Sequence, residues 1–283
     1  MKRIALSLVI LILLVGTAIT GCPGGDNVIG NGSSNGSGDG SGDILAPGMS
    51  AEEIAVAAIE AMSSGFNTYQ FDMDMEMTTT EEISMNMTVG ASGAVDMEAM
   101  KMFMDMAMGM EMIGLSIQVD MEMYLIDDWM YVKAEMLGMP PEWEKTQAPE
   151  GYHDQIVIAD QQLDLLPDFV GVELLGTETV NGVECYKLQV TPDMESLWAW
   201  AQMQEGTEEL EDLDLEEVLT DYSYIEWIAT DTYFIVKSIV EMTMAVDLTT
   251  LSMTVTTSMD HINEPVTIEL PPEAEAAIEV PFG

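Results

Sequence analysis

Methionine is the residue type that most distinguishes the chemistry of this sequence. It occurs 27 times in 283 residues, and between residues 73 and 123 it recurs at many alternate positions. A spacing of two places side chains on one face of a β-strand. The thioether is apolar, polarizable and flexible, so such a face suits a pocket for flexible apolar molecules. The same pattern is equally consistent with a core that the protein's own side chains fill.

The predicted lining combines these methionines with large apolar side chains from later in the chain. Between the methionines lie carboxylates and small polar residues, such as Asp72 and Asp74, which we expect to face water. The predicted lining residues are Met73, Met75, Met77, Met85, Met87, Met102, Met104, Met106, Met108, Met110, Met121, Met123, Trp198, Trp227, Phe234, Met242 and Met244.

A copper site is an alternative use of the same side chains. Thioethers are soft ligands that favour Cu(I), and alternate positions place neighbouring sulfur atoms on one face. The sulfur atoms are expected to face inward, however, and the chain has only two histidines, His153 and His261. Copper binding is therefore the weaker hypothesis, and we predict no metal site.

Catalytic motifs are absent from the sequence. There is no nucleophile elbow, no glycine-rich phosphate loop and no zinc signature. The acidic run at residues 205–217 lacks the spacing and the glycine of an EF-hand loop, so a solvated helix or loop is the better interpretation. We expect no catalytic residues, no cofactor and no enzymatic activity.

The charge balance excludes one class of partner. With 51 acidic and 7 basic side chains, the formal net charge is −44. Nucleic-acid binding requires basic surfaces that this composition does not supply. An anionic membrane surface would also repel the domain, so membrane contact is expected to come from a lipid anchor.

The N-terminus predicts export and anchoring. Residues 1–21 have a basic start, an apolar stretch over 4–15 and a small-residue exit, which is typical of a removable signal peptide. The exit Ile19-Thr20-Gly21-Cys22 resembles the lipobox of bacterial-type lipoproteins. That resemblance implies an acyl anchor, such as palmitate, on Cys22 and a cell-membrane protein on the extracytoplasmic side. The alternative is a secreted protein with a chance cysteine.

Two further regions follow Cys22. Residues 22–49 are rich in Gly, Ser, Asn and Asp, and are expected to form a disordered tether. Residues 50–283 are long enough for one domain with a substantial core. Since the lipid would occupy Cys22, Cys185 has no partner for a disulfide within the chain.

The expected fold is α+β: a strongly curved antiparallel half-barrel sheet covered by a few helices. A capping box at Ser50 predicts a helix that ends at Gly65. Alternating strands follow, with a turn or bulge at Ile113-Gly114 and a turn at Asn181-Gly182. Further helices are expected over 154–166 and 192–204. Later strands are expected over 222–230, 233–247, 251–263 and 266–270.

Three segments carry a family resemblance: NGVECYKL at 181–188, WIATDTYFIVK at 227–237 and NEPVTI at 263–268. With the order of elements, they resemble the LolA-like superfamily of lipoprotein carriers and its LppX-LprG-like lipoproteins. The resemblance implies an interior that binds or carries a lipid or another apolar ligand, with a possible partner protein for its transfer. The competing hypothesis is a structural, protein-interaction or envelope-sensing module with a filled core.

Overall fold

The computed structural model describes residues 49–80, 84–136, 141–148, 169–192, 218–246 and 249–280. These residues form a single large sheet, an α-helix and a short 3₁₀-helix. The helices are α2 (Ala51–Gly65) and η3 (Pro272–Ala276). The strands are β1 (Thr68–Thr80), β2 (Met85–Asp96), β3 (Lys101–Met112), β4 (Leu115–Ile126), β5 (Trp129–Met136), β6 (Trp143–Gln147), β7 (Phe169–Val180), β8 (Val183–Pro192), β9 (Leu219–Ala229), β10 (Ile235–Val246), β11 (Thr249–Asp260) and β12 (Ile278–Glu279).

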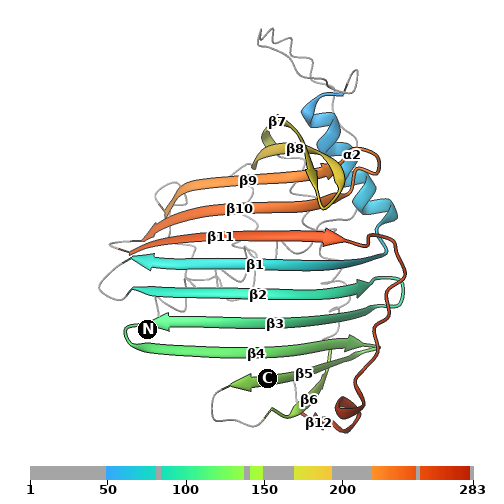
Figure 1. Cartoon of the computed structure of the whole chain (residues 1–283), viewed down its shortest axis with the longest axis vertical. Coiled ribbons are helices and arrows are strands. Elements are labelled where there is room, and N and C mark those ends of the chain that lie inside the picture. Colours follow the sequence, from blue (N-terminus) through green and yellow to red (C-terminus); the bar gives the residue numbers. More distant parts are fainter. Residues whose placement is uncertain are drawn as a thin grey trace.

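The sheet is open and almost entirely antiparallel. Its 12 strands follow the order β12-β6-β5-β4-β3-β2-β1-β11-β10-β9-β8-β7. The pairing of β12 with β6 is parallel. Within the described residues β7 and β12 form the two edges, and β7 and β8 fold over toward α2 at one end (Figure 1). The predicted curved, unclosed antiparallel sheet is confirmed.

Helix α2 begins where the sequence predicts it. The Ser50 hydroxyl accepts a hydrogen bond from the Glu53 backbone N–H at 3.2 Å, and Glu53 Oε2 accepts one from the Ser50 N–H at 2.7 Å. Ile54 and Ala58 then pack against the β8 and β9 side chains Leu188 and Ile228. None of the described helices has the length and apolar composition needed to cross a bilayer. The helix predicted over 154–166 lies outside the described residues, and so does the helix predicted over 192–204 except for Pro192, which ends strand β8.

Two-residue turns connect two of the hairpins. Ile113 and Gly114 have φ of 23° and 74°, and Asn181 and Gly182 have φ of 51° and 87°. Two positive φ values in succession match the twist of antiparallel strands, and a glycine adopts them at low cost. Of the two alternatives at Ile113-Gly114 the structure has the turn, and the predicted turn at Asn181-Gly182 is confirmed.

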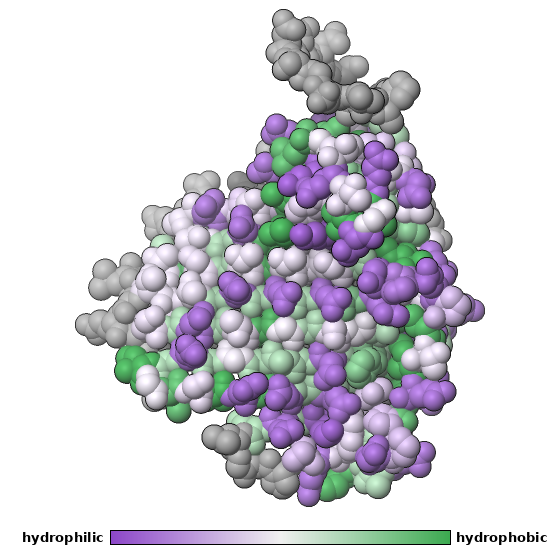
Figure 2. Space-filling model, viewed as in Figure 1, coloured by the Kyte–Doolittle hydropathy of each residue, from purple (hydrophilic) through white to green (hydrophobic). Residues whose placement is uncertain are grey.

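The two faces of the sheet differ in chemistry. On β1, the side chains from Phe71 to Met77 alternate between buried apolar and exposed acidic residues. We call the side that carries Met73, Met75 and Met77 the methionine face, and the side that carries Asp72 and Asp74 the carboxylate face. Figure 2 shows hydrophilic side chains distributed across the strands that face the viewer.

The predicted strand at 266–270 is wrong. This segment forms no strand in the structure, although Ile268 is buried. Instead, the chain after β11 passes across the ends of the strands toward η3 and β12 (Figure 1). Pro265 and Pro271 flank the segment and have no N–H to donate, which disfavours a continuous ladder there.

Candidate functional site

Strand register aligns the methionines of the methionine face in rows across the sheet. In one row each residue lies directly opposite the next on the neighbouring strand. From β9 to β4 this row consists of Tyr222, Met242, Met253, Met77, Met87, Met110 and Ile117. Side chains opposite each other on antiparallel strands are in contact range, so the row forms one continuous apolar surface.

Burial falls along the methionine face from its centre toward β4. On the central strands, Met77 is 1% exposed, Met253 2% and Met87 4%. The alternating apolar side chains of β3 and β4 are mostly only partly buried. The partly buried methionines of the predicted lining are Met102, Met104, Met106, Met108, Met110, Met121 and Met123. The face therefore extends from a dry core into a region where thioethers remain partly accessible.

The structure brings together every methionine of the predicted lining. By register, all of them lie on the methionine face, including Met85, Met242 and Met244. Phe234 lies just before β10, where its ring is 6.0 Å from that of Phe66 after α2, so it packs at one end of the same core. Trp198 lies outside the described residues.

Trp227 is a correction, because it belongs to the carboxylate face. It lies opposite Lys187 on β8 and Lys237 on β10, and Lys237 in turn lies opposite Ser258. Both lysine Nζ atoms are 4.8 Å from the centroid of the Trp227 ring. Its Nε1 donates to Glu178 Oε2 at 3.0 Å. Trp227 is thus a structural residue beneath two lysines and does not line the methionine face.

A set of polar residues on the methionine face was missed by sequence reasoning. Glu226, Ser238 and Thr257 occupy opposite positions on β9, β10 and β11. Their exposures are 7%, 4% and 1%. The alternation of β11 could have revealed Thr257, because this residue lies two positions from Val255 and so shares its face. A single threonine among apolar residues, however, does not by itself indicate a polar site.

The electrostatics of Glu226 follow from its burial. Loss of hydration raises the pKa of its carboxyl group, and the hydrogen bond that the Tyr224 hydroxyl donates to Glu226 Oε1 opposes this rise. Burial and the nearby Glu226 charge also raise the pKa of Tyr222. This end of the methionine face therefore favours uncharged groups.

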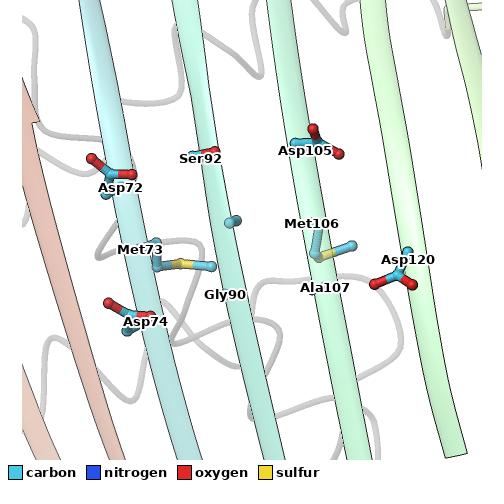
Figure 3. A pocket seen from close by; sticks show the side chains of 10 residues that line it. Asp72, Met73, Asp74, Gly90, Ser92, Asp105, Met106, Ala107 and Asp120 are labelled. Atoms are coloured by element: carbon cyan, nitrogen blue, oxygen red, sulfur yellow. The ribbon is translucent and has the colours of Figure 1, made fainter.

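The carboxylate face carries a shallow hollow of about 520 Å³ (Figure 3). It lies over Gly90, which has no side chain, and Ala107, whose side chain is a methyl group, so the surface is lower there than at the larger neighbours. The acidic groups around it are Asp72, Asp74, Asp105 and Asp120. Among the described residues no group of three or more His, Cys, Asp or Glu side chains is placed to hold a metal ion.

The remaining reactive side chains have structural surroundings. His261 is exposed, and its Nδ1 lies 2.8 Å from Glu264 Oε2, a hydrogen bond that raises the pKa of the imidazole. Cys185 is fully buried, and burial raises the pKa of its thiol, which suppresses the reactive thiolate. His153 lies outside the described residues.

Comparison with known proteins gives structural matches only. No protein-family model matches the chain, and no curated protein sequence is similar to it. The lipoprotein LppX of Mycobacterium tuberculosis is similar with a TM-score of 0.44 and 13% identity, over 77% of this chain and 98% of LppX. LprF from Mycobacterium bovis is similar with a TM-score of 0.44 and 14% identity, over 78% and 96% of the two chains.

Proposed function

We propose that this protein is an exported, membrane-anchored lipoprotein that binds or carries a lipid or another apolar ligand on the methionine face. A lipid on Cys22 would hold it at the extracytoplasmic side, and residues 22–49 would form the tether. The domain at 50–283 would bind its ligand without catalysis.

The gradient of burial on the methionine face is the observation that supports this proposal. Met77 and Met253 are in a dry core, while Met106 and Met121, farther along the same face, remain partly exposed. Apolar surface at the edge of a core is unfavourable unless something covers it. An acyl chain laid across β3 and β4 would complete that cover.

The energetics of such binding are favourable without a polar contact. Each methylene group buried contributes about 0.8 kcal/mol, so a long acyl chain supplies a large driving force. Methionine side chains can repack around chains of different shape, which favours a broad range of ligands.

The experiment is mass spectrometry of organic extracts from the purified, exported protein. We expect an apolar molecule in stoichiometric amount. A double variant, Met106→Gln with Met121→Gln, should lower its occupancy severalfold, because amide groups would then face the ligand. Thr88→Gln, which alters an exposed position on the carboxylate face of β2, is the matched control and should retain the ligand.

A structural or protein-interaction module with a filled core remains the second candidate. The nearly complete burial of Met77, Met87 and Met253 favours it, because these side chains already pack against one another. Under that hypothesis the extract is clean and the purified protein takes up no added lipid. Copper is a weaker candidate, and elemental analysis after exposure to Cu(I) would test it.

A further inference from the structure

One row of the methionine face contains polar instead of apolar side chains at one end. Glu226, Ser238 and Thr257 lie opposite one another on three neighbouring strands, and the next residue in the row is Met73. The row then continues through Ala91, Met106 and Met121. Polar groups thus adjoin the thioethers, and the same row leads to the partly exposed methionines.

The polar end of the row has unmet hydrogen-bonding capacity. Thr257 is 1% exposed, and among the described residues its hydroxyl Oγ1 has no hydrogen-bond partner. A buried hydroxyl without a partner is unfavourable by about 1–3 kcal/mol. Within the part of the chain that the structure describes, Glu226 accepts a hydrogen bond from the Tyr224 hydroxyl at one of its two carboxyl oxygens, Oε1. These groups would gain from a ligand that brings its own oxygen atoms.

The charges around the row define what kind of head group fits. Five lysines follow Arg3 in the sequence. By register all five lie on the carboxylate face, and two of them, Lys187 and Lys237, lie beside Trp227. A carboxylate or phosphate on the methionine face would therefore meet no lysine among the described residues. Burial favours the uncharged form of Glu226, which can donate a hydrogen bond to a hydroxyl or ester oxygen.

We propose that Glu226, Ser238 and Thr257 form a polar anchor that binds the uncharged, oxygen-bearing head of an apolar ligand. The ligand class is a long-chain alcohol or an acyl ester with free hydroxyl groups. Its tail lies along the row from Met73 toward Met121. Strands in a sheet are about 4.8 Å apart, so the four spacings from Thr257 to Met121 span about 19 Å, enough for a long acyl chain. This inference rests on the proposed function.

The test is a competition titration on the full-length protein after its co-purified ligand has been removed. Nile red bound to the protein is displaced by molecules with the same tail and different heads: hexadecanol, monopalmitin, palmitate, hexadecylammonium and hexadecane. We expect hexadecanol and monopalmitin to displace the dye at concentrations about fivefold or more below those of the other three, the factor of roughly one neutral hydrogen bond.

Three variants connect that preference to the row. Thr257→Val and Ser238→Ala should each reduce the preference for the alcohol and the ester about fivefold, and leave the affinity for hexadecane unchanged. Thr254→Val removes a hydroxyl from the carboxylate face of the same strand and should alter nothing. Removing the unpaired hydroxyl of Thr257 should also leave the melting temperature equal or higher, which separates an effect on binding from unfolding.

The negative results of this titration distinguish failure of the polar anchor from failure of the proposed function. If the protein binds nile red and hexadecane but shows no head-group preference, or if Thr257→Val and Ser238→Ala preserve the preference, the polar anchor is refuted and the proposed function stands. Tighter binding of palmitate or hexadecylammonium also refutes the anchor. If neither the dye nor any competitor binds, the proposed function fails and the anchor fails with it.

Discussion

Glu226 is a carboxyl group buried among apolar side chains, and it connects stability to pH. Because burial raises its pKa in the folded state, the folded protein holds this proton more strongly than the unfolded chain does. Its contribution to stability is fully present below the ordinary pKa of a glutamate and is lost as the pH rises through the folded pKa. At neutral pH the group therefore weakens the fold.

Replacing Glu226 by glutamine should raise the melting temperature at neutral pH. Glutamine retains an acceptor for the Tyr224 hydroxyl and cannot ionise, so the cost of burying an ionisable group is removed. A gain of about 1 kcal/mol corresponds to about 2–4 °C for a domain of this size. The difference should vanish below about pH 3, where the carboxyl group is protonated in both states.

Thermal unfolding followed by circular dichroism across this pH range measures the effect. Glu76→Gln, at an exposed position of β1, is the control and should give a much smaller change. A Glu226→Gln protein that melts lower at neutral pH would contradict this account of the buried carboxyl group.

Gly93 is required by a close approach between strands. A Cβ atom at this position would lie 2.2 Å from the Phe103 carbonyl oxygen and 2.7 Å from the Phe71 ring. Gly93→Ala should therefore destabilise the fold by about 1–3 kcal/mol, the usual range for overpacking. Gly90→Ala is the matched control on β2, since its nearest neighbour would be 3.8 Å away. Urea denaturation compares the two, and equal stabilities would refute the steric explanation.

At the scale of single elements, the first half of the sheet was predictable. In β1 and β2 acidic or small polar residues separate the methionines, so only one face of each strand is apolar. A two-residue turn with Gly114 then fixes the register of the β3–β4 hairpin. The methionines of the predicted lining consequently share one face.

Strand β9 shows where the same method fails. Its side chains are apolar or aromatic on both faces, with Ile225 and Trp227 on one and Tyr222 and Tyr224 on the other. The alternation therefore does not show which face of β9 is the inner one. Glu226 suggests that its own face is exposed, whereas Glu226 is buried. The buried row with Ser238 and Thr257 depends on pairing between three strands, which no single segment encodes.

The capping box of α2 makes a prediction for this element. Ser50→Ala removes the acceptor of the Glu53 N–H and should destabilise the protein by about 1 kcal/mol. Helix α2 packs on the methionine face through Met62, so the loss should appear in the global unfolding transition. Ser116→Ala, on the exposed surface of β4, is the control. A Ser50→Ala protein with unchanged unfolding would show that α2 is uncoupled from the sheet.

At the scale of the whole molecule, most of the few lysines have the same kind of neighbour, a tryptophan ring. Of the five lysines beyond Arg3, four lie over tryptophan rings. The Nζ of Lys145 is 4.7 Å from the Trp129 centroid, and that of Lys133 is 5.4 Å from the Trp143 centroid. Such contacts stabilise a cation near an aromatic face. They leave most of the 51 acidic groups without a cationic partner.

Uncompensated negative charge predicts that salt stabilises the protein. At a net charge of −44, self-repulsion opposes the compact state. Raising NaCl from about 0.1 M to about 1 M shortens the screening length from about 10 Å to about 3 Å. The melting temperature at neutral pH should therefore rise by several degrees. Near about pH 4, where most carboxylates take up protons, the rise should be much smaller. A salt-independent melting temperature would contradict this reading of the charge.

The central claim is that an apolar ligand binds between the methionine face of the sheet and the rest of the protein. A crystal structure of the protein with a brominated acyl ester tests this most directly, because bromine marks the chain by anomalous scattering. The account predicts bromine peaks within contact distance, about 4 Å, of Met106 and Met121. A methionine face that is filled by the protein's own side chains, with no bromine beside it, would contradict the account.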